Sequence, residues 1–434
     1  MASREQIDFL KGHPNPSLLP ITLIKHAAQT ALSNHEIAVK ALLYGPDPGY
    51  EPLREEIAKW LNSFYRPTTP TTAQRICISG GASQNLGCIL GVYTDPEYTR
   101  NIWIVAPAYF LAFRIFEDAG FAGKMRAVPE DGEGLDIAFL RTAIAGSEDE
   151  AKRKGNLHPV YKPGRERAKV YKHIVYCVPT FANPTSRTMS LRRRKDLLRL
   201  AQDYDALIVA DDVYDFLQWP AAAKDHIETD VAHLPRLVDL DDAGDGFGNS
   251  CSNGSFSKIA GPGLRTGWVE GTERFVYGVS QAGVQRSGGA PSQLTSTYVA
   301  DLLSTGKLQN HIQDILRPAY ARRYGKLMHA INEHLFPLGF RLPQPDRKVA
   351  GGYFVWLGLP LDMAAVELVK RCVEDNVVII AGERFEVPGD SSLSFPHSIR
   401  LCLAWEEEDK LTEGVQRIAR CAQELLRSQY VLVS

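Results

Sequence analysis

The feature that most constrains the fold is an alternation of short apolar segments with amphipathic ones through the middle of the chain. The apolar segments, rich in residues that favour strands, are 75–79, 101–106, 173–178 and 206–210. Segments 82–93 and 190–204 lie between them and have the spacing of amphipathic helices. Strands that are apolar on both faces occur in parallel sheets covered by helices on both sides. The pattern therefore predicts an α/β fold around such a sheet.

The C-terminal part of the chain predicts a second, smaller unit. A long helical stretch follows Asp314 and leads to the apolar and aromatic segment 351–357. With segments 377–380 and 398–404, it indicates a smaller sheet with helices on one face. We expect the N-terminal segment to return and pack with this unit. At 434 residues, the chain is long enough for two or three domains.

Two segments have the composition of surface insertions. Segment 146–172 is rich in charged residues, glycine and proline, and segment 239–254 is rich in Asp, Gly, Asn and Ser. Neither offers enough apolar surface to be held rigidly. We expect both to be mobile surface loops. The second ends beside Ser255, where it either gates a site or is passive surface, and its composition favours passive surface.

The overall charge and the cysteines exclude several classes of function. A net charge of −2 gives no electrostatic reason to bind nucleic acid or an anionic membrane. No apolar run approaches the roughly 20 residues of a spanning helix, and the first ten residues lack the apolar core of a signal peptide. The seven cysteines are dispersed without a Cys-x-x-Cys pair, which argues against a zinc site or disulfides. We therefore expect a cytoplasmic protein with reduced thiols, no metal, and small-molecule partners.

The segment Ser255-Phe256-Ser257-Lys258, with Arg265 seven residues after the lysine, has the groups that a phosphate-bearing aldehyde requires. The serine hydroxyls and the planar fork of the arginine can bind a phosphate. The amine of Lys258 can form a Schiff base with a carbonyl group. Pyridoxal phosphate combines an aldehyde with a phosphate, so these residues predict a site for it. The alternative is a surface lysine in a flexible glycine loop.

The strand at 206–210 leads to the acid that such a cofactor needs. A carboxylate beside the pyridine nitrogen keeps that nitrogen protonated, so that the ring can accept electrons. Such an acid belongs at the carboxyl end of a strand, where α/β folds bind ligands. Asp211 is our candidate for this role and Tyr214 for a hydrogen bond to the ring's 3-oxygen, while Asp212 faces away. The alternative is that these acids only cap the structure that follows.

Three further turns agree with a cofactor site. Asn183, between two prolines, can donate to the 3-oxygen and orient a substrate carboxylate, although Asn-Pro-Thr is also an ordinary turn sequence. The turn Gly80-Gly81-Ala82-Ser83 joins a strand to a helix, where backbone N–H groups and the Ser83 hydroxyl can bind phosphate. Tyr109 ends the next strand and can lie flat on a pyridine ring, or be an ordinary buried tyrosine.

Arg400 lies inside an otherwise apolar strand segment. Burying a guanidinium is costly unless an anion meets it. A substrate α-carboxylate bound by both arms of the guanidinium meets that need, and an internal salt bridge is the alternative.

Taken in order along the chain, these residues resemble the class I and II aminotransferases, which are pyridoxal phosphate enzymes of fold type I. The chain looks closest to the α-aminoadipate and kynurenine aminotransferase branch, and the resemblance covers nearly its whole length. It rests on the segment 44–50 with Leu53-Arg54, the Gly81 turn, Tyr109, Asn183-Pro184, 211–214, 255–268, the segment 351–357, Arg400 and the opening segment 9–20.

The resemblance implies a role for each candidate residue. Lys258 would hold the cofactor as a Schiff base, and Asp211 would pair with its pyridine nitrogen. Tyr109 would stack on the ring, while Tyr214 and Asn183 would contact the 3-oxygen. The phosphate would be held by Gly81, Ala82, Ser83, Ser255, Ser257 and Arg265.

The resemblance also implies substrate and partner contacts. Arg400 would bind the α-carboxylate together with Asn183, and Gly12 would lie over the substrate. Tyr44 would reach the cofactor phosphate of a second copy, so the protein would be a homodimer with shared active sites. Ala82 and Lys11 stand where the family often has a hydroxyl residue and a glycine. These departures leave the identity of the substrate side chain open.

The implied fold is the pyridoxal-phosphate transferase fold type I. It has a large domain, with a mostly parallel seven-stranded sheet between helices, and a smaller α+β C-terminal domain. The boundaries that we expect are 1–45 for an N-terminal segment, 46–315 for the large domain and 316–434 for the small domain.

The implied activity is transamination. Lys258 would take the α-proton of an L-amino acid, and the amino group would pass to a 2-oxo acid, with 2-oxoglutarate as the expected acceptor. Aromatic, aminoadipate-like and branched-chain donors all stay open. The main alternative is elimination, replacement or cyclisation on the same scaffold, as in biosynthetic enzymes. A more distant one is a ligand-sensing transcription regulator, which we do not expect because the pattern starts within the first dozen residues and leaves no room for a DNA-binding domain before it.

Overall fold

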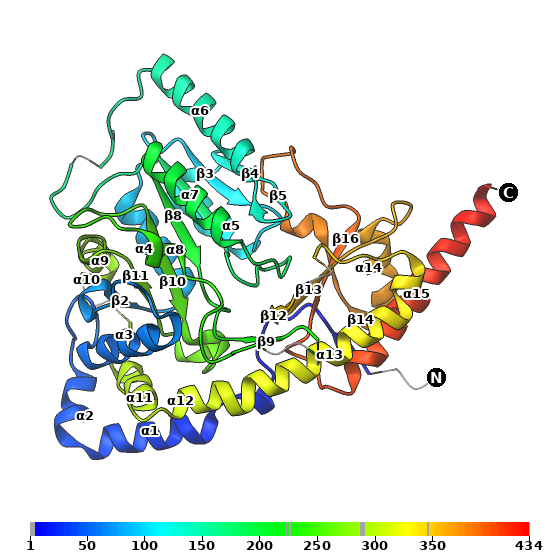
Figure 1. The fold of residues 1–434 in the computed structure, drawn as a ribbon, viewed down its shortest axis with the longest axis horizontal. Coiled ribbons are helices and arrows are strands. Elements are labelled where there is room, and N and C mark those ends of the chain that lie inside the picture. Colours follow the sequence, from blue (N-terminus) through cyan, green and yellow to red (C-terminus); the bar gives the residue numbers. More distant parts are fainter. Residues whose placement is uncertain are drawn as a thin grey trace.

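The structure is a computed structural model that describes residues 5–162, 164–222, 224, 227–286, 291–344 and 347–433. A seven-stranded sheet runs through the larger part of the molecule (Figure 1). Its strands in spatial order are β2 (Ile76–Ser79), β11 (Gly267–Glu270), β10 (Ser250–Ser255), β8 (Ala206–Asp211), β7 (His173–Cys177), β3 (Asn101–Val105) and β4 (Met125–Val128). All are parallel except β11, which runs antiparallel to both neighbours. This mostly parallel sheet confirms the predicted fold class.

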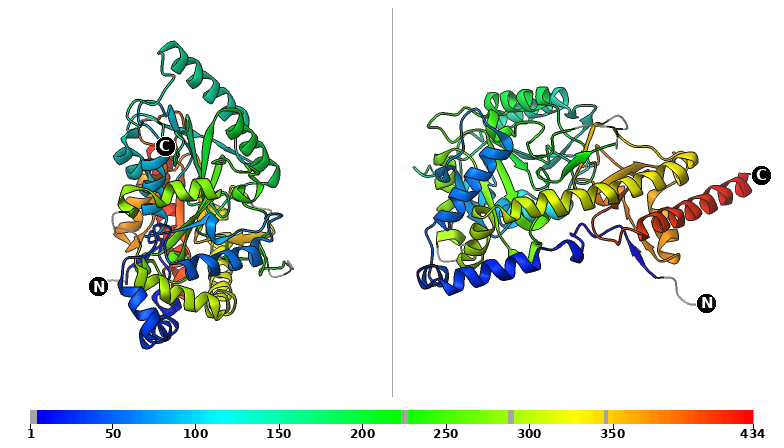
Figure 2. Two further views of the ribbon diagram at one scale, coloured as in Figure 1. Left: turned by 90° about the vertical axis from the view of Figure 1, so that its left-hand side faces the viewer. Right: turned by 60° about the horizontal axis from the view of Figure 1, so that its bottom comes forward.

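Helices cover both faces of the sheet, because successive side chains of a strand point to opposite sides. The helices of one face are α4 (Ala82–Tyr93), α5 (Leu111–Phe116) and α9 (Glu273–Ser280), and those of the other are α6 (Ile137–Arg153), α7 (Leu191–Asp203) and α8 (Leu237–Leu240). In β3, Ile102 and Ile104 belong to the buried cluster of the first group. Trp103 between them belongs to the cluster of the second group. Figure 2 shows the sheet between the two sets of helices.

The segments predicted as mobile loops are only partly irregular, and the prediction is wrong in two places. Segment 146–172 begins inside α6, which continues to Arg153 and buries Leu140, Ile144 and Ala151. Segment 239–254 ends in β10, whose six residues are all buried. Polar side chains are accommodated there because they bond inside the sheet, as the Ser252 hydroxyl does to the Asp212 carboxylate.

A smaller antiparallel sheet holds the C-terminal part of the chain. Its strands in order are β13 (Phe354–Gly358), β16 (Ser398–Cys402) and β15 (Ile380–Ala381), and the helices of this part are α13 (Arg317–His334), α14 (Ala365–Glu374) and α15 (Lys410–Val433). The N-terminal segment returns here, where β1 (Ile7–Asp8) pairs in parallel with β14 (Val377–Val378). The Phe9 side chain is fully buried beside this pair and anchors the residues that follow.

The remaining helices and short strand pairs lie outside these two sheets. The helices are α1 (Ile21–Ser33), α2 (His35–Leu42), α3 (Glu51–Tyr65), α10 (Gly283–Arg286), α11 (Gln293–Ser304) and α12 (Lys307–Asn310). The short strand pairs are β9 (Gln218–Pro220) with β12 (Val349–Gly351) and β5 (Glu130–Asp131) with β6 (Gly134–Leu135). Helix α11 packs against α1, α2 and α3. Among the residues that the structure describes, none of the helices has both the length and the apolar character needed to cross a membrane.

Candidate active site

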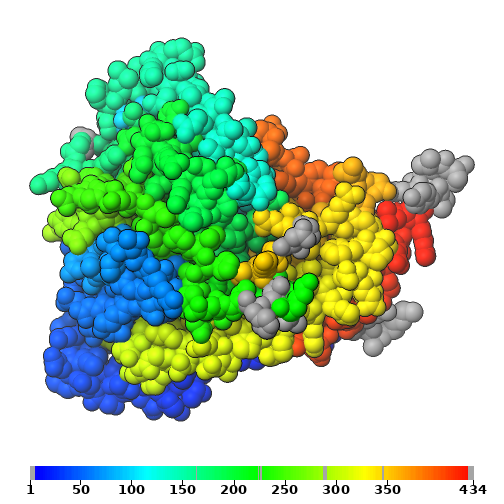
Figure 3. All heavy atoms as spheres, in the orientation of Figure 1, coloured from blue at the N-terminus to red at the C-terminus, as the bar shows by residue number. Residues whose placement is uncertain are grey.

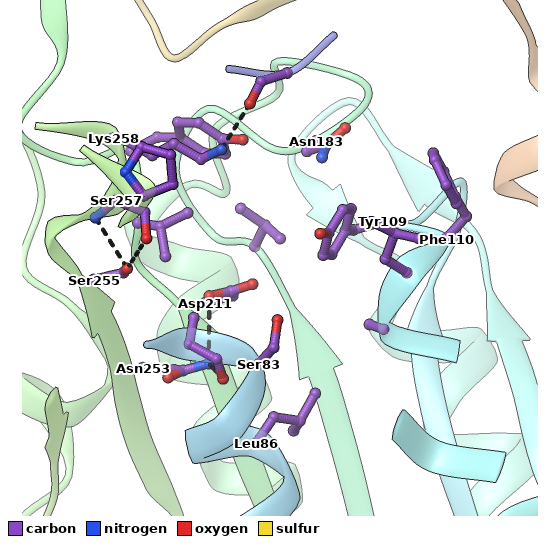
Figure 4. Close-up of a pocket in the computed structure, with 18 of the residues that line it drawn as sticks. Ser83, Leu86, Tyr109, Phe110, Asn183, Asp211, Asn253, Ser255, Ser257 and Lys258 are labelled. Carbon is purple, nitrogen blue, oxygen red and sulfur yellow. Dashed lines mark hydrogen bonds between the residues drawn. The ribbon is translucent and has the colours of Figure 1, made fainter. Parts of the chain in front are cut away.

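A cavity of about 380 Å³ lies at the carboxyl ends of the parallel strands, where α/β sheets bind ligands (Figure 4). The predicted residues that line it are Gly12, Ala82, Ser83, Tyr109, Asn183, Asp211, Tyr214, Ser255, Ser257, Lys258, Arg265 and Arg400. Gly81 is not one of the lining residues, but it precedes Ala82 and lies close to the Arg265 side chain, which lines the cavity. The fold thus brings together residues that are spread over almost the whole chain.

Lys258 ends a short 3-10 turn, Phe256–Lys258, that follows β10. Its ε-amine donates a hydrogen bond to the Gly12 carbonyl oxygen at 2.8 Å, so the N-terminal segment lies over the amine. The Tyr353 hydroxyl donates to the Lys258 carbonyl oxygen at 2.9 Å and fixes the backbone of the turn. Burial disfavours the charged ammonium and lowers the pKa of Lys258 to about 8. Near neutral pH, more of this amine is therefore neutral and nucleophilic than in an ordinary lysine.

Asp211 is the last residue of β8, and each of its carboxylate oxygens accepts one hydrogen bond. The Tyr176 hydroxyl donates to Oδ2 at 2.8 Å, and the Asn253 amide donates to Oδ1 at 3.4 Å. Burial raises the pKa of Asp211 to about 6, while the hydrogen bond from Tyr176 and the charge of Lys258 act in the opposite direction. An ionised carboxylate in this position can hold a ring nitrogen in its protonated form.

A group of hydrogen-bond donors lies beside the start of α4. The hydroxyl oxygens of Ser255 and Ser257 are 2.9 Å apart, and the Arg265 guanidinium donates to two backbone carbonyl oxygens at 2.9 and 2.7 Å. Gly81 precedes the helix with a φ of 107°, and a Cβ there would lie 2.8 Å from an Arg265 nitrogen. Only glycine lets the backbone come so close. Hydroxyls, a guanidinium and a helix N-terminus together suit a phosphate.

Arg400 approaches the cavity from β16 of the small sheet. It is 3% exposed, and desolvation lowers its pKa. The guanidinium donates to Asn183 Oδ1 at 3.1 Å and to the Leu10 carbonyl oxygen at 2.6 Å, and its carbon lies 4.1 Å from the centre of the Phe354 ring. Its Nε is buried and has no partner within the described part of the chain. A buried cation with an unused donor suits an anion such as a carboxylate.

Two tyrosines give the cavity aromatic and hydroxyl surface. Tyr109 follows β3 and lies across the cavity from Lys258 (Figure 4). Tyr214 is buried beyond the end of β8, and its ring centre lies 5.8 Å from the Lys258 amine. Burial raises the pKa of Tyr214 well above its usual value, so its hydroxyl stays protonated and can donate a hydrogen bond.

Tyr44 is the one predicted site residue that lies apart from this cavity. Its side chain is 90% exposed, and the preceding Leu42 and Leu43 are 70% and 62% exposed. A contact between Tyr44 and a cofactor therefore requires a second copy of the chain.

Sequence reasoning misses three buried side chains that complete the site. Tyr176 and Asn253 bind the Asp211 carboxylate, and Tyr353 fixes the lysine-bearing turn. Tyr176 carries a usable signal, because it lies near the end of a predicted strand, at the same edge as Asp211. Asn253 carries none, since it lies in the polar segment that was predicted as a loop.

The chemistry of this cavity fits pyridoxal phosphate. That cofactor has a phosphate, an aldehyde and a protonated pyridine ring, and the cavity offers phosphate donors, an amine of lowered pKa and a buried carboxylate. A mostly parallel seven-stranded sheet with such a site defines the pyridoxal-phosphate enzymes of fold type I.

Within that class, the chain belongs to the family of class I and II aminotransferases, whose family model matches residues 6–418. Its cofactor is pyridoxal phosphate, and its reaction is the transfer of an amino group between an amino acid and a 2-oxo acid.

Known proteins resemble the chain over nearly its whole length. An uncharacterised protein of Saccharomyces cerevisiae, YER152C, is 34% identical over 95% of this chain and 96% of its own. The 2-aminoadipate transaminase of Thermus thermophilus is 28% identical over 97% of this chain and 91% of its own. The crystal structure of Pyrococcus horikoshii kynurenine aminotransferase, in complex with PMP, matches with a TM-score of 0.77 at 28% identity, over 97% of this chain and 91% of that one. These relatives confirm the predicted branch of the family.

Proposed function

We propose that this protein moves the α-amino group of an L-amino acid with a large apolar or aromatic side chain to 2-oxoglutarate. The observation that carries the proposal is that Lys258, Asp211 and Arg400 open on one cavity. When bound, pyridoxal phosphate supplies an aldehyde that links to the amino group and a ring that withdraws electrons from the substrate's Cα.

Each of these residues has a defined task in the proposal. The Lys258 amine takes the α-proton at Nζ as a general base and later returns a proton. The Asp211 carboxylate holds the proton of the ring nitrogen. The Arg400 guanidinium, with the Asn183 amide, binds the α-carboxylate and sets the direction of the other substituents. The backbone around Gly12 covers the amine and limits the access of water.

The walls of the cavity support a donor with an apolar side chain. The apolar lining outside the cofactor contacts consists of Leu10, Leu86, Phe110, Leu111, Ile115 and Phe354. Lys11 also lines the cavity, with its amine 3.8 Å from the Asp8 carboxylate and its side chain 46% exposed. This partly exposed amine can reach the distal carboxylate of 2-oxoglutarate, which the apolar lining alone would not accommodate.

The proposal includes a homodimer with shared active sites. The exposed apolar side chains of α1, α2 and the residues after them are Ile21, Leu32, Val39, Leu42, Leu43 and Tyr44. Figure 3 shows this dark-blue region as an outer corner of the molecule. Large exposed apolar side chains are common at interfaces between protein chains, and in the proposed dimer Tyr44 reaches the phosphate site of the second copy.

The state of the cysteines supports a cytoplasmic location as a further part of the proposal. All seven are unpaired and buried. A protein with many unpaired thiols suits a reducing compartment.

A single-turnover experiment tests the reaction. Enzyme carrying pyridoxal phosphate is mixed with one amino acid at a time and no acceptor, and we expect stoichiometric pyridoxamine phosphate with aromatic and large apolar donors. Adding 2-oxoglutarate then restores the original cofactor and yields glutamate. Elimination, replacement or cyclisation would not accumulate pyridoxamine phosphate, so its absence with every donor would favour that alternative.

Replacing the lysine tests the role that we assign to it. We expect K258A to fold and bind the cofactor but to lose turnover about a thousandfold, because it lacks the general base. The surface variant K59A, on α3, serves as the control and should keep the wild-type rate. A K258A rate within tenfold of the wild type would contradict the assignment.

A further inference from the structure

Two buried asparagines lie on the side of Asp211 that faces α4. Asn253 is on β10, directly opposite Asp211 in the pairing of β10 with β8. Asn85 is in the first turns of α4. Each is only 1% exposed. Buried amides are usually satisfied by hydrogen bonds, and within the described residues Asn85 Oδ1 is the one polar side-chain atom of this pair without a partner. The partners of the other atoms indicate what the pair does.

The hydrogen bonds of this asparagine pair connect three elements. The Asn85 amide nitrogen donates to Asn253 Oδ1 at 2.8 Å. The Asn253 amide nitrogen donates to the Ala82 carbonyl oxygen at 3.1 Å and to Asp211 Oδ1 at 3.4 Å (Figure 4). One side chain thus links the acid at the end of β8 to the first residue of α4, which follows the turn of the proposed phosphate site.

The orientation of the Asn253 amide is fixed by this arrangement. Its nitrogen faces two acceptors, and its oxygen faces the donor group of Asn85. A flipped amide would place its oxygen against the Ala82 carbonyl and the Asp211 carboxylate. The donor therefore points at the carboxylate in this arrangement, and a donor of this kind favours the ionised form of an acid.

Several other groups face the Asp211 carboxylate, among them the neutral side chains of Tyr214 and Cys177, whose pKa values are raised by burial and also by the Asp211 charge. The Tyr176 hydroxyl, on β7, donates to the second oxygen. Lys258 and Tyr109 act on it electrostatically from across the cavity. Asp212 is adjacent in sequence, but it accepts a hydrogen bond from Ser252 instead. On the α4 side, Asn253 is the donor that the described residues supply.

We propose that Asn253, held by Asn85, is a positioning residue of the reaction, which keeps the Asp211 carboxylate ionised and in fixed register with the turn that begins α4. This inference rests on the proposed role of Asp211. Asn253 lines the cavity beside Asp211, and in this scheme it acts through the Asp211 carboxylate. Its expected effect is on the protonation of the ring nitrogen and not on the α-carboxylate site.

The test measures protonation directly. The first measurement is a ¹³C NMR titration of apoenzyme labelled at its aspartate carboxyls, with the Asp211 signal assigned by its loss in D211N. We expect N253L to raise the midpoint of that signal from about 6 by about one pH unit. The second is the ¹⁵N shift of ring-labelled pyridoxal phosphate in the holoenzyme. We expect a smaller protonated fraction in N253L and about a tenfold lower kcat, with KM for the donor unchanged.

Two further variants keep the test decisive if N253L does not fold. N253D is close in shape and places a second carboxyl beside Asp211, so we expect a larger upward shift of the midpoint. N85L removes the group that holds the Asn253 amide, and we expect a shift in the same direction but smaller. N101L is the matched control, because Asn101 is also a buried amide on a strand of the large sheet but lies at the amino end of β3, whereas the cavity lies at the carboxyl ends of the strands. It should lower stability without moving the Asp211 midpoint.

The outcomes separate this inference from the proposed function. Wild-type midpoints and ¹⁵N shifts in the Asn253 and Asn85 variants, alongside an altered ¹⁵N shift in D211N, would overturn the inference and leave the role of Asp211 standing. An unchanged ¹⁵N shift in D211N would overturn both. If N101L moved the Asp211 midpoint as far as N253L does, the shift would reflect a general loss of stability, which would also overturn the inference.

Discussion

The ε-amine of Lys258 owes its reactivity to its place in the structure. Removal from water destabilises the ammonium and lowers the pKa to about 8. Lys59, on the surface of α3, shows the opposite effect, because a hydrogen bond to Glu56 raises its pKa. At a given pH, a larger fraction of the Lys258 amine than of the Lys59 amine is therefore neutral.

The pH dependence of cofactor uptake follows from this pKa. We predict that apoenzyme takes up pyridoxal phosphate faster as the pH rises and that the rate levels off above about 8. Below that pH the amine is mostly protonated, and each unit of decrease lowers its neutral fraction about tenfold. Stopped-flow absorbance gives the rate, and Nα-acetyl-lysine in solution gives the cofactor's own pH dependence. A rate that still climbs between about pH 9 and 10 would show an ordinary lysine.

Individual elements could be predicted from the sequence where local pattern and tertiary role agree. The first five residues of β8 are apolar, so the sequence predicts this strand, and Asp211 at its end could be predicted together with it. The Ser-Cys-Ser-Asn-Gly-Ser segment of β10 reads as a loop, because its side chains find partners only in the fold, such as Asp241 for the Ser250 hydroxyl. Asn253 could not be predicted for the same reason, because its side chain finds its partners only in the fold. Tyr176 was missed although it lies near the end of a predicted strand.

Two glycines, one in the turn before α4 and one inside that helix, allow a paired test of the turn's role in cofactor binding. Gly81 has a φ of 107° and a ψ of 168°, a region that essentially only glycine adopts. We predict that G81A strains the turn, displaces Arg265 and weakens pyridoxal phosphate binding about tenfold, on the order of the strain expected for such a residue. A fluorescence titration with the cofactor measures the change.

The control for this prediction is Gly91 in the interior of the same helix. A Cβ at Gly91 would meet no atom within 4 Å. G91A should stabilise the protein by about 0.5–1 kcal/mol in urea unfolding and leave cofactor affinity unchanged. Equal affinities of G81A and the wild type would contradict the role of this turn.

The whole molecule combines two sheets in one site. Asp211 ends a strand of the large sheet, and Lys258 lies in the turn that follows the neighbouring strand β10. Arg400 belongs to the small sheet, and the N-terminal segment contacts Lys258 and Arg400 through the carbonyls of Gly12 and Leu10. The active site therefore depends on how these two parts are held together, and the proposed dimer adds a third contribution through Tyr44.

The dimer is predicted to dissociate when charge is placed on the exposed corner formed by α1 and α2. Leu43 is 62% exposed, and L43E should shift the protein to monomer in sedimentation velocity and lower cofactor affinity, because a buried carboxylate disfavours the interface. L361E is the matched control. Leu361 is 86% exposed and lies between β13 and α14, in the C-terminal part of the molecule and not at the corner formed by α1 and α2. A wild-type protein that sediments as a monomer would refute the shared site.

The proposed binding of the α-carboxylate by Arg400, with the amino group directed to Lys258, has a stereochemical consequence. When the amine of an amino acid is directed to one sheet and its carboxylate to the other, two substituents of Cα are left to occupy two remaining directions. Only one mirror image then turns its hydrogen toward the lysine while its side chain enters the apolar wall. Chirality is thus selected by the span between two sheets, and no single residue has to recognise handedness.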